Sequence, residues 1–371
     1  MKKNIKKKSI NIFLRCDLNI TDNDLSRIDL SVPTIQKLLE FNFVHKLIIC
    51  SHLGRPNGPN NNLSLIHKVL PELEKKIDLN IEFLNYDDDL KFKNFHSSSN
   101  RLFLLENIRF FSGEENNDKD LSSSLASLCD VFVNDAFGTS HRKHSSVYGI
   151  SSLIDSYAGF LLENEYKILE RLSSSSKKNS VLILGGAKIE DKSGILNNLV
   201  DKVDKIIIGG GMISNFLQSK LSDDLTKIFD KNRDKFYIPE DILVSENLSP
   251  DSKTNIISSN EYVGSLKILD IGMKSLNSIS KIINNMQIAL WNGSMGVFEW
   301  EHCSIGTRGL LDILVSNKNL KTFSGGGSTI EAINRFSNKS SFEHVSSGGG
   351  AFLSMLEKGI LPGMENILIN E

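Results

Sequence analysis

The chain has 371 residues, and its 43 lysine and arginine residues nearly balance its 45 aspartate and glutamate residues, which gives a formal net charge of −2. At about 150 residues per domain, this length indicates two domains more readily than one. The near-neutral balance argues against the broadly basic surface of nucleic-acid-binding proteins, although local clusters of donors can still bind small anions.

We expect a cytoplasmic protein without a membrane or nucleic-acid partner. The basic residues 1–8 are followed by an apolar run, residues 10–14, that is too short for a signal peptide and ends at Arg15. No run approaches the roughly 18 apolar residues of a membrane-spanning helix. The cysteines form no C-x-x-C pair and lack metal-ligand spacing, which fits a reducing compartment. They are Cys16, Cys50, Cys129 and Cys303.

Short apolar runs typical of strands alternate with helical patterns along the whole chain. The expected strands are residues 10–14, 46–51, 81–84, 101–105, 131–135, 181–184, 205–208, 267–270, 288–291, 321–324 and 344–346. The helical patterns between them include residues 30–41, 65–76 and 279–285. This alternation predicts an α/β fold of parallel sheets with crossover helices.

A helical stretch followed by a polar run marks the expected domain boundary. Residues 160–172 have a helical pattern, and residues 173–178 are serines and lysines that favour an exposed loop. We therefore expect a first domain over residues 1–157, a hinge helix and linker over residues 158–176, and a second domain over residues 177–351.

Four expected strands of the second domain run into glycines and then into a helix. The glycines are Gly185-Gly186 and residues 209–211, 325–327 and 348–350. Glycine lets backbone N–H groups approach a phosphate, and the following helix supplies unpaired donors. A helix cap or a tight turn explains most single glycine pairs, but four of them at the ends of parallel strands are harder to explain in this way. The sequence has neither the P-loop nor the dinucleotide-binding fingerprint.

Two lysines and a glutamate accompany these glycines. Lys188 and Lys192 would share one helical face and could bind an anion, or Glu190 and Asp191 could simply neutralise them. Glu299, beyond the Asn292-Gly293 turn, could accept hydrogen bonds from ribose hydroxyls or could merely be exposed.

The first domain places arginines after its expected strands, although the chain has only ten arginines and strongly prefers lysine. The guanidinium fork binds carboxylate and phosphate through two hydrogen bonds at once. One edge of the sheet would then suit a small anion with a phosphate and a carboxylate, unless the arginines form surface ion pairs and the histidine is structural. The residues concerned are Asp17, Asn19, Arg27, His52, Arg55, Arg109 and Arg142.

Taken in order, these segments resemble the phosphoglycerate kinase family over nearly the whole chain. The matching segments are residues 15–19, 51–56, 104–110, 133–146, 184–192, 207–212, 291–299, 324–329 and 344–351. Of these, the run over residues 134–144 is long and specific. The resemblance implies two Rossmann-like α/β lobes, each a parallel sheet flanked by helices, joined by a hinge helix. It also implies that the C-terminal tail, from about residue 352 to residue 371, packs back on the first lobe.

The resemblance implies a glycolytic enzyme, a monomer that closes its domains to transfer a phosphoryl group between 1,3-bisphosphoglycerate and ADP. The residues implied to hold 3-phosphoglycerate or its 1-phosphorylated form are Asp17, Leu18, Asn19, Arg27, His52, Leu53, Gly54, Arg55, Arg109 and Arg142. The residues implied to hold ATP or ADP are Gly185, Lys188, Lys192, Gly209, Gly210, Asn292, Glu299, Gly326, Gly327, Ser328 and Thr329. The residues expected to act on the transferring group are Arg27, Lys192, Gly348 and Gly349.

One position departs from the family pattern. Ser328 stands where the family has an aspartate that binds the magnesium ion of the nucleotide, and a neutral hydroxyl is a weaker ligand for a hard cation. Glu331, one turn on, could act through water. A second hypothesis is therefore a nucleotide-binding homologue with weak or no catalysis. A third, an oxidoreductase on a dinucleotide fold, is disfavoured because the fingerprint is missing.

Overall fold

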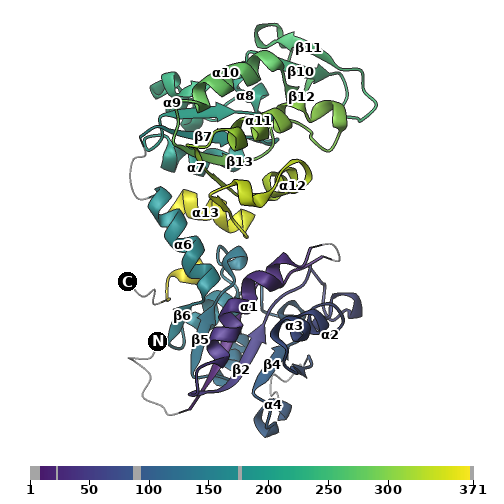
Figure 1. Cartoon of the computed structure of the whole chain (residues 1–371), viewed down its shortest axis with the longest axis vertical. Helices are drawn as coiled ribbons and strands as arrows, with labels where there is room; N and C mark the ends of the chain where they lie inside the picture. Colours follow the sequence, from purple (N-terminus) through teal and green to yellow (C-terminus); the bar gives the residue numbers. More distant parts are fainter. Residues whose placement is uncertain (1–8, 22–23, 87–92, 174–177, 368–371) are drawn as a thin grey trace. The chain divides into compact units, whose positions relative to one another are not determined.

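The computed structural model of the chain describes residues 9–21, 24–86, 93–173 and 178–367 (Figure 1). The chain forms two compact units: unit 1 runs to Ile168 and resumes at Ile360, and unit 2 spans Leu169–Gly359. The division falls inside helix α6 (Phe160–Ser173). Part of the expected linker, residues 174–177, lies outside the described residues.

Unit 1 contains a six-stranded sheet in the order β3-β4-β2-β1-β5-β6, and every neighbouring pair is parallel. Its strands are mostly apolar and buried, as expected when helices cover both faces of a parallel sheet. The strands are β1 (Ile10–Arg15), β2 (Val44–Cys50), β3 (Glu82–Leu84), β4 (Leu102–Leu105), β5 (Val131–Asn134) and β6 (Ser156–Ala158). The three-residue strand β6 was not predicted.

The helices of unit 1 largely follow the sequence pattern, with one break. The helix expected over residues 65–76 is two helices, and Pro71 stands in the first turn of the second, where a missing N–H costs least. The helices are α1 (Ser26–Leu39), α2 (Leu65–Lys68), α3 (Leu70–Ile77), α4 (Lys93–Ser97) and α5 (Lys119–Ser127).

The C-terminal segment belongs to unit 1. The N–H of Gly363 donates to the carbonyl of Ser140 at 2.8 Å, and the Asn134 side-chain amide donates to the carbonyl of Gly363 at 3.0 Å. This return begins at Ile360, later than the expected start near residue 352, because residues 349–358 form a helix of unit 2.

Unit 2 contains a second six-stranded parallel sheet, in the order β15-β14-β13-β7-β8-β9. The strands are β7 (Ser180–Leu184), β8 (Lys205–Ile208), β9 (Phe236–Tyr237), β13 (Ile288–Asn292), β14 (Lys321–Ser324) and β15 (His344–Val345). The central strand β7 lies between β8 and β13, so the chain reverses its direction of travel across the sheet there. Ligands of open α/β sheets bind at the carboxyl ends of strands around such a point.

A small antiparallel sheet, in the order β11-β10-β12, was not predicted. Its strands are β10 (Asp241–Ser245), β11 (Asn255–Ser258) and β12 (Lys267–Ile271). The expectation that residues 267–270 would join a parallel sheet was wrong, because β12 pairs antiparallel with β10. Most of β11 is exposed, so it lacks the buried apolar run by which a strand is recognised.

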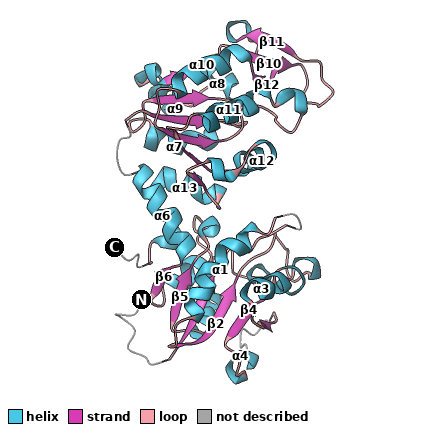
Figure 2. Cartoon of the chain, in the orientation of Figure 1, coloured by secondary structure: helices cyan, strands magenta, loops and turns pink. Residues whose placement is uncertain are grey.

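Helices surround the sheets in each unit (Figure 2). Those of unit 2 are α7 (Ser193–Leu199), α8 (Ile213–Leu217), α9 (Asp223–Lys231), α10 (Met273–Ile283), α11 (Ile305–Ser316), α12 (Gly327–Phe336) and α13 (Gly349–Lys358). None of the helices in the described part of the chain is both long and apolar enough to cross a membrane. The predicted class, two lobes that each contain a helix-flanked parallel sheet, is confirmed.

Candidate active site

In unit 1, the carboxyl ends of β1 and β2 bring three predicted residues together. Asp17 forms an ion pair with Arg27, and Oδ1 of Asp17 lies 4.0 Å from Nδ1 of His52. Asp17 and His52 are buried, whereas the Arg27 side chain is about one-third exposed, at 32%. The guanidinium group is therefore held in place by the carboxylate and remains accessible to an anion.

His52 lies in an electropositive environment. Burial, together with the positive charges of Arg15, Arg109 and Arg27, holds the pKa of His52 well below its usual range. The ring is therefore neutral at physiological pH, and it can orient a ligand by a hydrogen bond but adds no charge.

The loop that follows β2 is tied to Asn19 and Arg109. Oδ1 of Asn19 accepts a hydrogen bond from the N–H of Gly54 at 2.8 Å, and Nη1 of Arg109 donates to the carbonyl of Gly54. Gly54 has a φ of +62°, which favours glycine, and a Cβ there would come within 2.9 Å of Leu63. These three predicted residues are thus neighbours in the fold.

The remaining predicted residues of unit 1 differ in which of their atoms could contact a ligand. Arg55 is exposed, and Nε of Arg142 lies 3.1 Å from Nε2 of His141. Burial and the charge of Arg142 lower the pKa of His141 to about 4. The side chains of Leu18 and Leu53 are buried in the core, so only their backbone atoms could meet a ligand.

A buried network behind these residues was missed by sequence reasoning. Nε of Arg15 donates to Oγ of Ser146 at 2.9 Å, and this hydroxyl donates to Oε1 of Glu114 at 2.7 Å. Burial alone would raise the pKa of Glu114, but His144, Arg15 and Ser146 together lower it. The charged Glu114 balances Arg15. Glu114 lies in a polar loop, so nothing in the sequence indicated that it would pair with Arg15.

In unit 2, the segments that follow β7 and β13 are in direct contact. The N–H groups of Gly185 and Gly186 donate to the carbonyls of Asn292 and Ser294 at 2.8 and 3.1 Å. A Cβ at Gly185 would lie 2.0 Å from the carbonyl oxygen of Ser294, so this approach requires glycine. Gly185 therefore holds the backbone of residues 292–294 in place by close packing and does not need a side chain of its own.

Lys192 and Asn292 form the polar centre of this region. Nζ of Lys192 donates to Oδ1 of Asn292, and the amide of Asn292 donates to the carbonyl of Gly325. Burial lowers the pKa of Lys192. Oγ1 of Thr329 accepts from the N–H of Gly293 at 2.7 Å, so Thr329 also supports the turn after β13.

The N-termini of α12 and α13 lie side by side in unit 2. A Cβ at Gly349 would be 2.8 Å from Cα of Gly326, and a Cβ at Gly326 would be 2.4 Å from Nδ2 of Asn292. Gly348 is the residue immediately before α13. The starts of α12 and α13 therefore lie close together, with α12 beginning beside Asn292, and the N–H of Gly348 donates to Oγ of Ser346 at 3.3 Å. Helix N-termini of this kind suit a phosphate.

Next to this region is an open cavity of about 540 Å³ within unit 2. The predicted residues Gly210, Glu299 and Ser328 line it, whereas Gly209 lies behind it and packs against Met295. The small antiparallel sheet and its connections contribute lining residues that the sequence did not indicate. They are Leu248, Tyr262, Gly264, Leu266, Lys267 and Ile268.

Lys188 does not share a helical face with Lys192, contrary to the helical interpretation of this segment. It is exposed and lies before the short 3-10 helix Glu190–Lys192, which leads into α7. The spacing of the two lysines was therefore no guide to their geometry.

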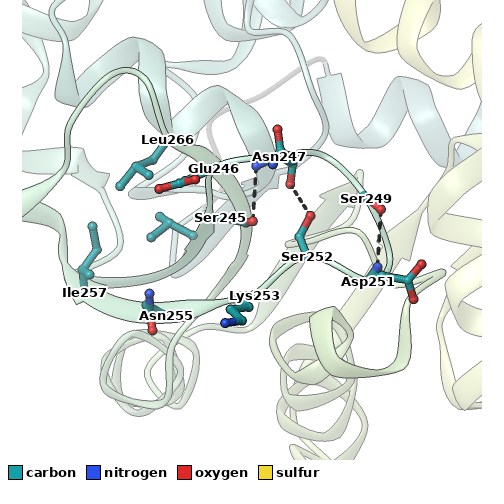
Figure 3. A pocket seen from close by; sticks show the side chains of 11 residues that line it. Ser245, Glu246, Asn247, Ser249, Asp251, Ser252, Lys253, Asn255, Ile257 and Leu266 are labelled. Atoms are coloured by element: carbon teal, nitrogen blue, oxygen red, sulfur yellow. Dashed lines mark hydrogen bonds between the residues drawn. The ribbon is translucent and has the colours of Figure 1, made fainter.

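A second hollow, of about 720 Å³, lies at the end of β10 and the start of β11. Figure 3 shows three of its serine side chains hydrogen-bonded to backbone atoms of their own loop, with Ser252 donating to the carbonyl of Asn247 at 3.0 Å. Glu246 and Asp251 line it with Lys253 as the one basic lining residue, so it suits an anion less well than the first cavity.

Comparison with known proteins shows the family of the chain. The model of the family "Phosphoglycerate kinase" matches residues 2–359. The phosphoglycerate kinase of Helicobacter pylori is 38% identical, over 96% of this chain and 91% of that protein, and the enzyme of Helicobacter hepaticus is 36% identical, over 95% and 93%.

Solved structures give the same result. The structure of phosphoglycerate kinase from Coxiella burnetii has a TM-score of 0.84 at 31% identity, with 98% of this chain and 97% of that one covered. The enzyme from Pyrococcus horikoshii gives a TM-score of 0.78 at 25% identity, with 98% and 97% covered. The chain is a phosphotransferase that belongs to the phosphoglycerate kinase family.

Proposed function

We propose that the family reaction, reversible phosphoryl transfer from 1,3-bisphosphoglycerate to ADP, takes place here with the phosphoglycerate on unit 1 and the nucleotide on unit 2. The observation that carries this assignment is the convergence of the N-termini of α12 and α13 on Lys192 and Asn292 beside an open cavity. Such a convergence suits the phosphates of a nucleotide.

For the nucleotide, we assign the base to the cavity wall at Gly210, with Gly209 packed behind it against Met295, and the ribose to Glu299. Residues 326–329, with Lys188 and Lys192, would bind the phosphates. Gly185 and Asn292 would position these groups, in agreement with the hydrogen bonds from the N–H of Gly185 to the carbonyl of Asn292 and from the amide of Asn292 to the carbonyl of Gly325.

For the phosphoglycerate, we assign phosphate and carboxylate binding to the arginines of unit 1. Arg27 is oriented by Asp17, and Arg109 and Asn19 hold the loop that bears Gly54 and Arg55. The neutral His52 would accept or donate a hydrogen bond without adding charge. Arg142 completes the set, with backbone atoms of Leu18 and Leu53.

The chemistry needs little acid–base catalysis, because the acceptor carboxylate is already ionised. It needs in-line positioning and stabilisation of the charge on the transferring phosphoryl group. We assign this stabilisation to Arg27, Lys192 and the N–H groups of Gly348 and Gly349. Because the substrates are held on different units, the units must close for transfer, and closure would also exclude water.

The metal site is where this chain departs from the family pattern, at Ser328. Ser328 lines the nucleotide cavity, and its hydroxyl oxygen is a hard ligand that fits a magnesium ion carried by the phosphates. Magnesium would neutralise phosphate charge there. In the described part of the chain, no group of three or more His, Cys, Asp or Glu side chains forms a separate metal site.

A coupled assay with 3-phosphoglycerate, ATP and magnesium tests the proposed reaction. We expect turnover, and nothing in the fold or the comparisons favours the hypothesis of an inactive homologue. Nucleotide binding without turnover would contradict the proposal.

We further propose that the protein acts as a cytoplasmic monomer in glycolysis. Size-exclusion chromatography with light scattering tests the oligomeric state.

The Ser328→Asp variant tests the metal assignment separately. A carboxylate at this position should lower the magnesium concentration needed for half-maximal activity by about tenfold, since a charged ligand binds a hard cation more tightly than a hydroxyl. The measurement is a magnesium titration at saturating substrates. An unchanged titration would place the metal away from position 328.

A further inference from the structure

Asp270 is a buried carboxylate on β12 that none of the assignments above uses. Its side chain is 1% exposed, and Oδ2 accepts a hydrogen bond from the N–H of Gly306 at 2.7 Å. Gly306 lies in the first turn of α11, so Asp270 ties β12 to the start of that helix. Within the described residues, Oδ1 has no hydrogen-bond partner.

The two elements joined by Asp270 each hold the loop over residues 294–299. On one side, the N–H of Val297 donates to the carbonyl of Leu269, the neighbour of Asp270, at 2.8 Å. On the other side, the N–H of Met295 donates to Oγ1 of Thr307, the neighbour of Gly306, at 3.1 Å. The carboxylate thus lies where both anchors of the loop meet.

The carboxylate also touches the loop itself. A Cβ at Gly296 would lie 2.3 Å from Oδ1 of Asp270, so the backbone of the loop packs directly on this oxygen. Ser294, Gly296, Val297 and Glu299 of the loop line the cavity. A shift of Asp270 would therefore change the wall of that cavity.

We infer that Asp270 is a positioning residue for the nucleotide, which fastens β12 to α11 beneath the loop over residues 294–299 and so fixes the cavity wall that includes Glu299. This inference rests on the proposed nucleotide site. Asp270 does not touch the substrate, and it acts through the loop.

The charge state of Asp270 should make nucleotide affinity depend on pH. Burial raises the pKa of Asp270 to about 7, although backbone hydrogen bonds from Gly306 and Ile271 oppose this. The loop, α11 and β10 present Gly296, Gly306 and Leu243, which do not titrate. The short helix Glu301–Cys303 presents Cys303, whose pKa burial and Asp270 raise to about 11. The 3-10 helix Gly210–Met212, which also packs against β12, has no titratable side chain. Of Asp270 and the described residues that face it, Asp270 is therefore the group that changes charge near neutrality.

The ionised carboxylate accepts the Gly306 hydrogen bond more strongly than the neutral acid does. Nucleotide affinity should therefore weaken as the pH falls from 8 to 6. The Asp270→Asn variant keeps the shape and removes the titration. We expect it to raise the Kd for magnesium-ADP about fivefold at pH 8, to flatten the pH profile of that Kd, and to leave kcat and the KM for 3-phosphoglycerate within about twofold.

Asp241 offers a matched control in the same small sheet. It is buried on β10, and its carboxylate accepts hydrogen bonds from the N–H groups of Lys274 and Ser275, at 3.1 and 2.8 Å, in the first turn of α10. Asp241→Asn makes the same chemical change at another helix start. Its Kd for magnesium-ADP should stay within about twofold of the wild type at pH 8.

Equilibrium titration of the full chain with magnesium-ADP distinguishes the outcomes. If the wild type binds no ADP, the proposed nucleotide site itself is wrong. If the wild type binds and Asp270→Asn matches it in affinity and pH profile, or Asp241→Asn weakens binding equally, the role of Asp270 is overturned. Should Asp270→Asn fail to fold, Gly296→Ala disturbs the same contact from the loop side, and unchanged ADP affinity in that variant overturns the inference.

Discussion

At the scale of single residues, the clearest feature of unit 1 is a carboxylate that caps α6. Asp135 is fully buried, and its Oδ1 accepts hydrogen bonds from the N–H groups of Leu161 and Leu162 at 2.8 and 3.3 Å. It directly follows β5 and belongs to the segment that leads to Arg142. One side chain thus links the end of β5 to the start of α6.

Burial makes the stability contribution of Asp135 depend on pH. It raises the pKa of Asp135 from 3.8 to about 6, so the folded chain binds a proton that the unfolded chain has lost. Stability should therefore fall by up to about 3 kcal/mol as the pH rises from about 4 to about 6. Asp135→Asn should remove this slope, which denaturant unfolding of both proteins at pH 4.5 and pH 7 would measure. Parallel slopes would contradict the effect.

Sequence reasoning found the polar residues of unit 1 but not their buried partners. Asp17, Arg27 and His52 were predicted to share one edge of the sheet, and they lie together there. Glu114 was not found, because its connection to Arg15 through Ser146 depends on tertiary packing of distant loops.

At the scale of elements, two adjacent glycines at the start of α12 allow the backbone geometry of this turn to be tested by substitution. Gly326 has a φ of +111°, and a Cβ there would meet the Asn292 amide at 2.4 Å. Among the described residues, none comes within 4 Å of a Cβ at Gly327, which has an ordinary φ. The two positions therefore differ in strain while sharing one turn of chain.

Gly326→Ala should lower the free energy of unfolding by about 1–3 kcal/mol, since alanine disfavours this backbone conformation, while Gly327→Ala should change it by less than about 1 kcal/mol. Thermal unfolding of both variants measures the difference. Equal losses at both positions would show that the turn before α12 is not constrained as described.

Three of the strands that the sequence did not predict share a physical cause, whereas β10 was missed although it contains the buried Ile242 and Val244. β11 is exposed and β6 and β9 are very short, so none carries a run of buried apolar residues. The antiparallel pairing of β12 depends on β10, and an apolar run by itself does not encode the direction of its partner.

At the scale of the whole molecule, the alternation of strands and helices was sufficient to predict two α/β lobes. The order of strands in each sheet was not accessible, because pairing depends on long-range contacts. The same holds for the return of the chain at Ile360 to unit 1, where Gly363 bonds to Ser140. In this case the family resemblance, and no local pattern, indicated the return.

The proposed reaction depends on charged groups of unit 1 that act on a phosphoryl group supplied by the nucleotide. Arg27→Ala addresses this directly, with the exposed Arg233, ion-paired with Asp230 in unit 2, as a control position. The measurement is kcat in the coupled assay beside the Kd for magnesium-ADP. We predict that Arg27→Ala lowers kcat by about 100-fold or more, with the Kd within about twofold and Arg233→Ala unaffected. Full turnover in Arg27→Ala would contradict the account.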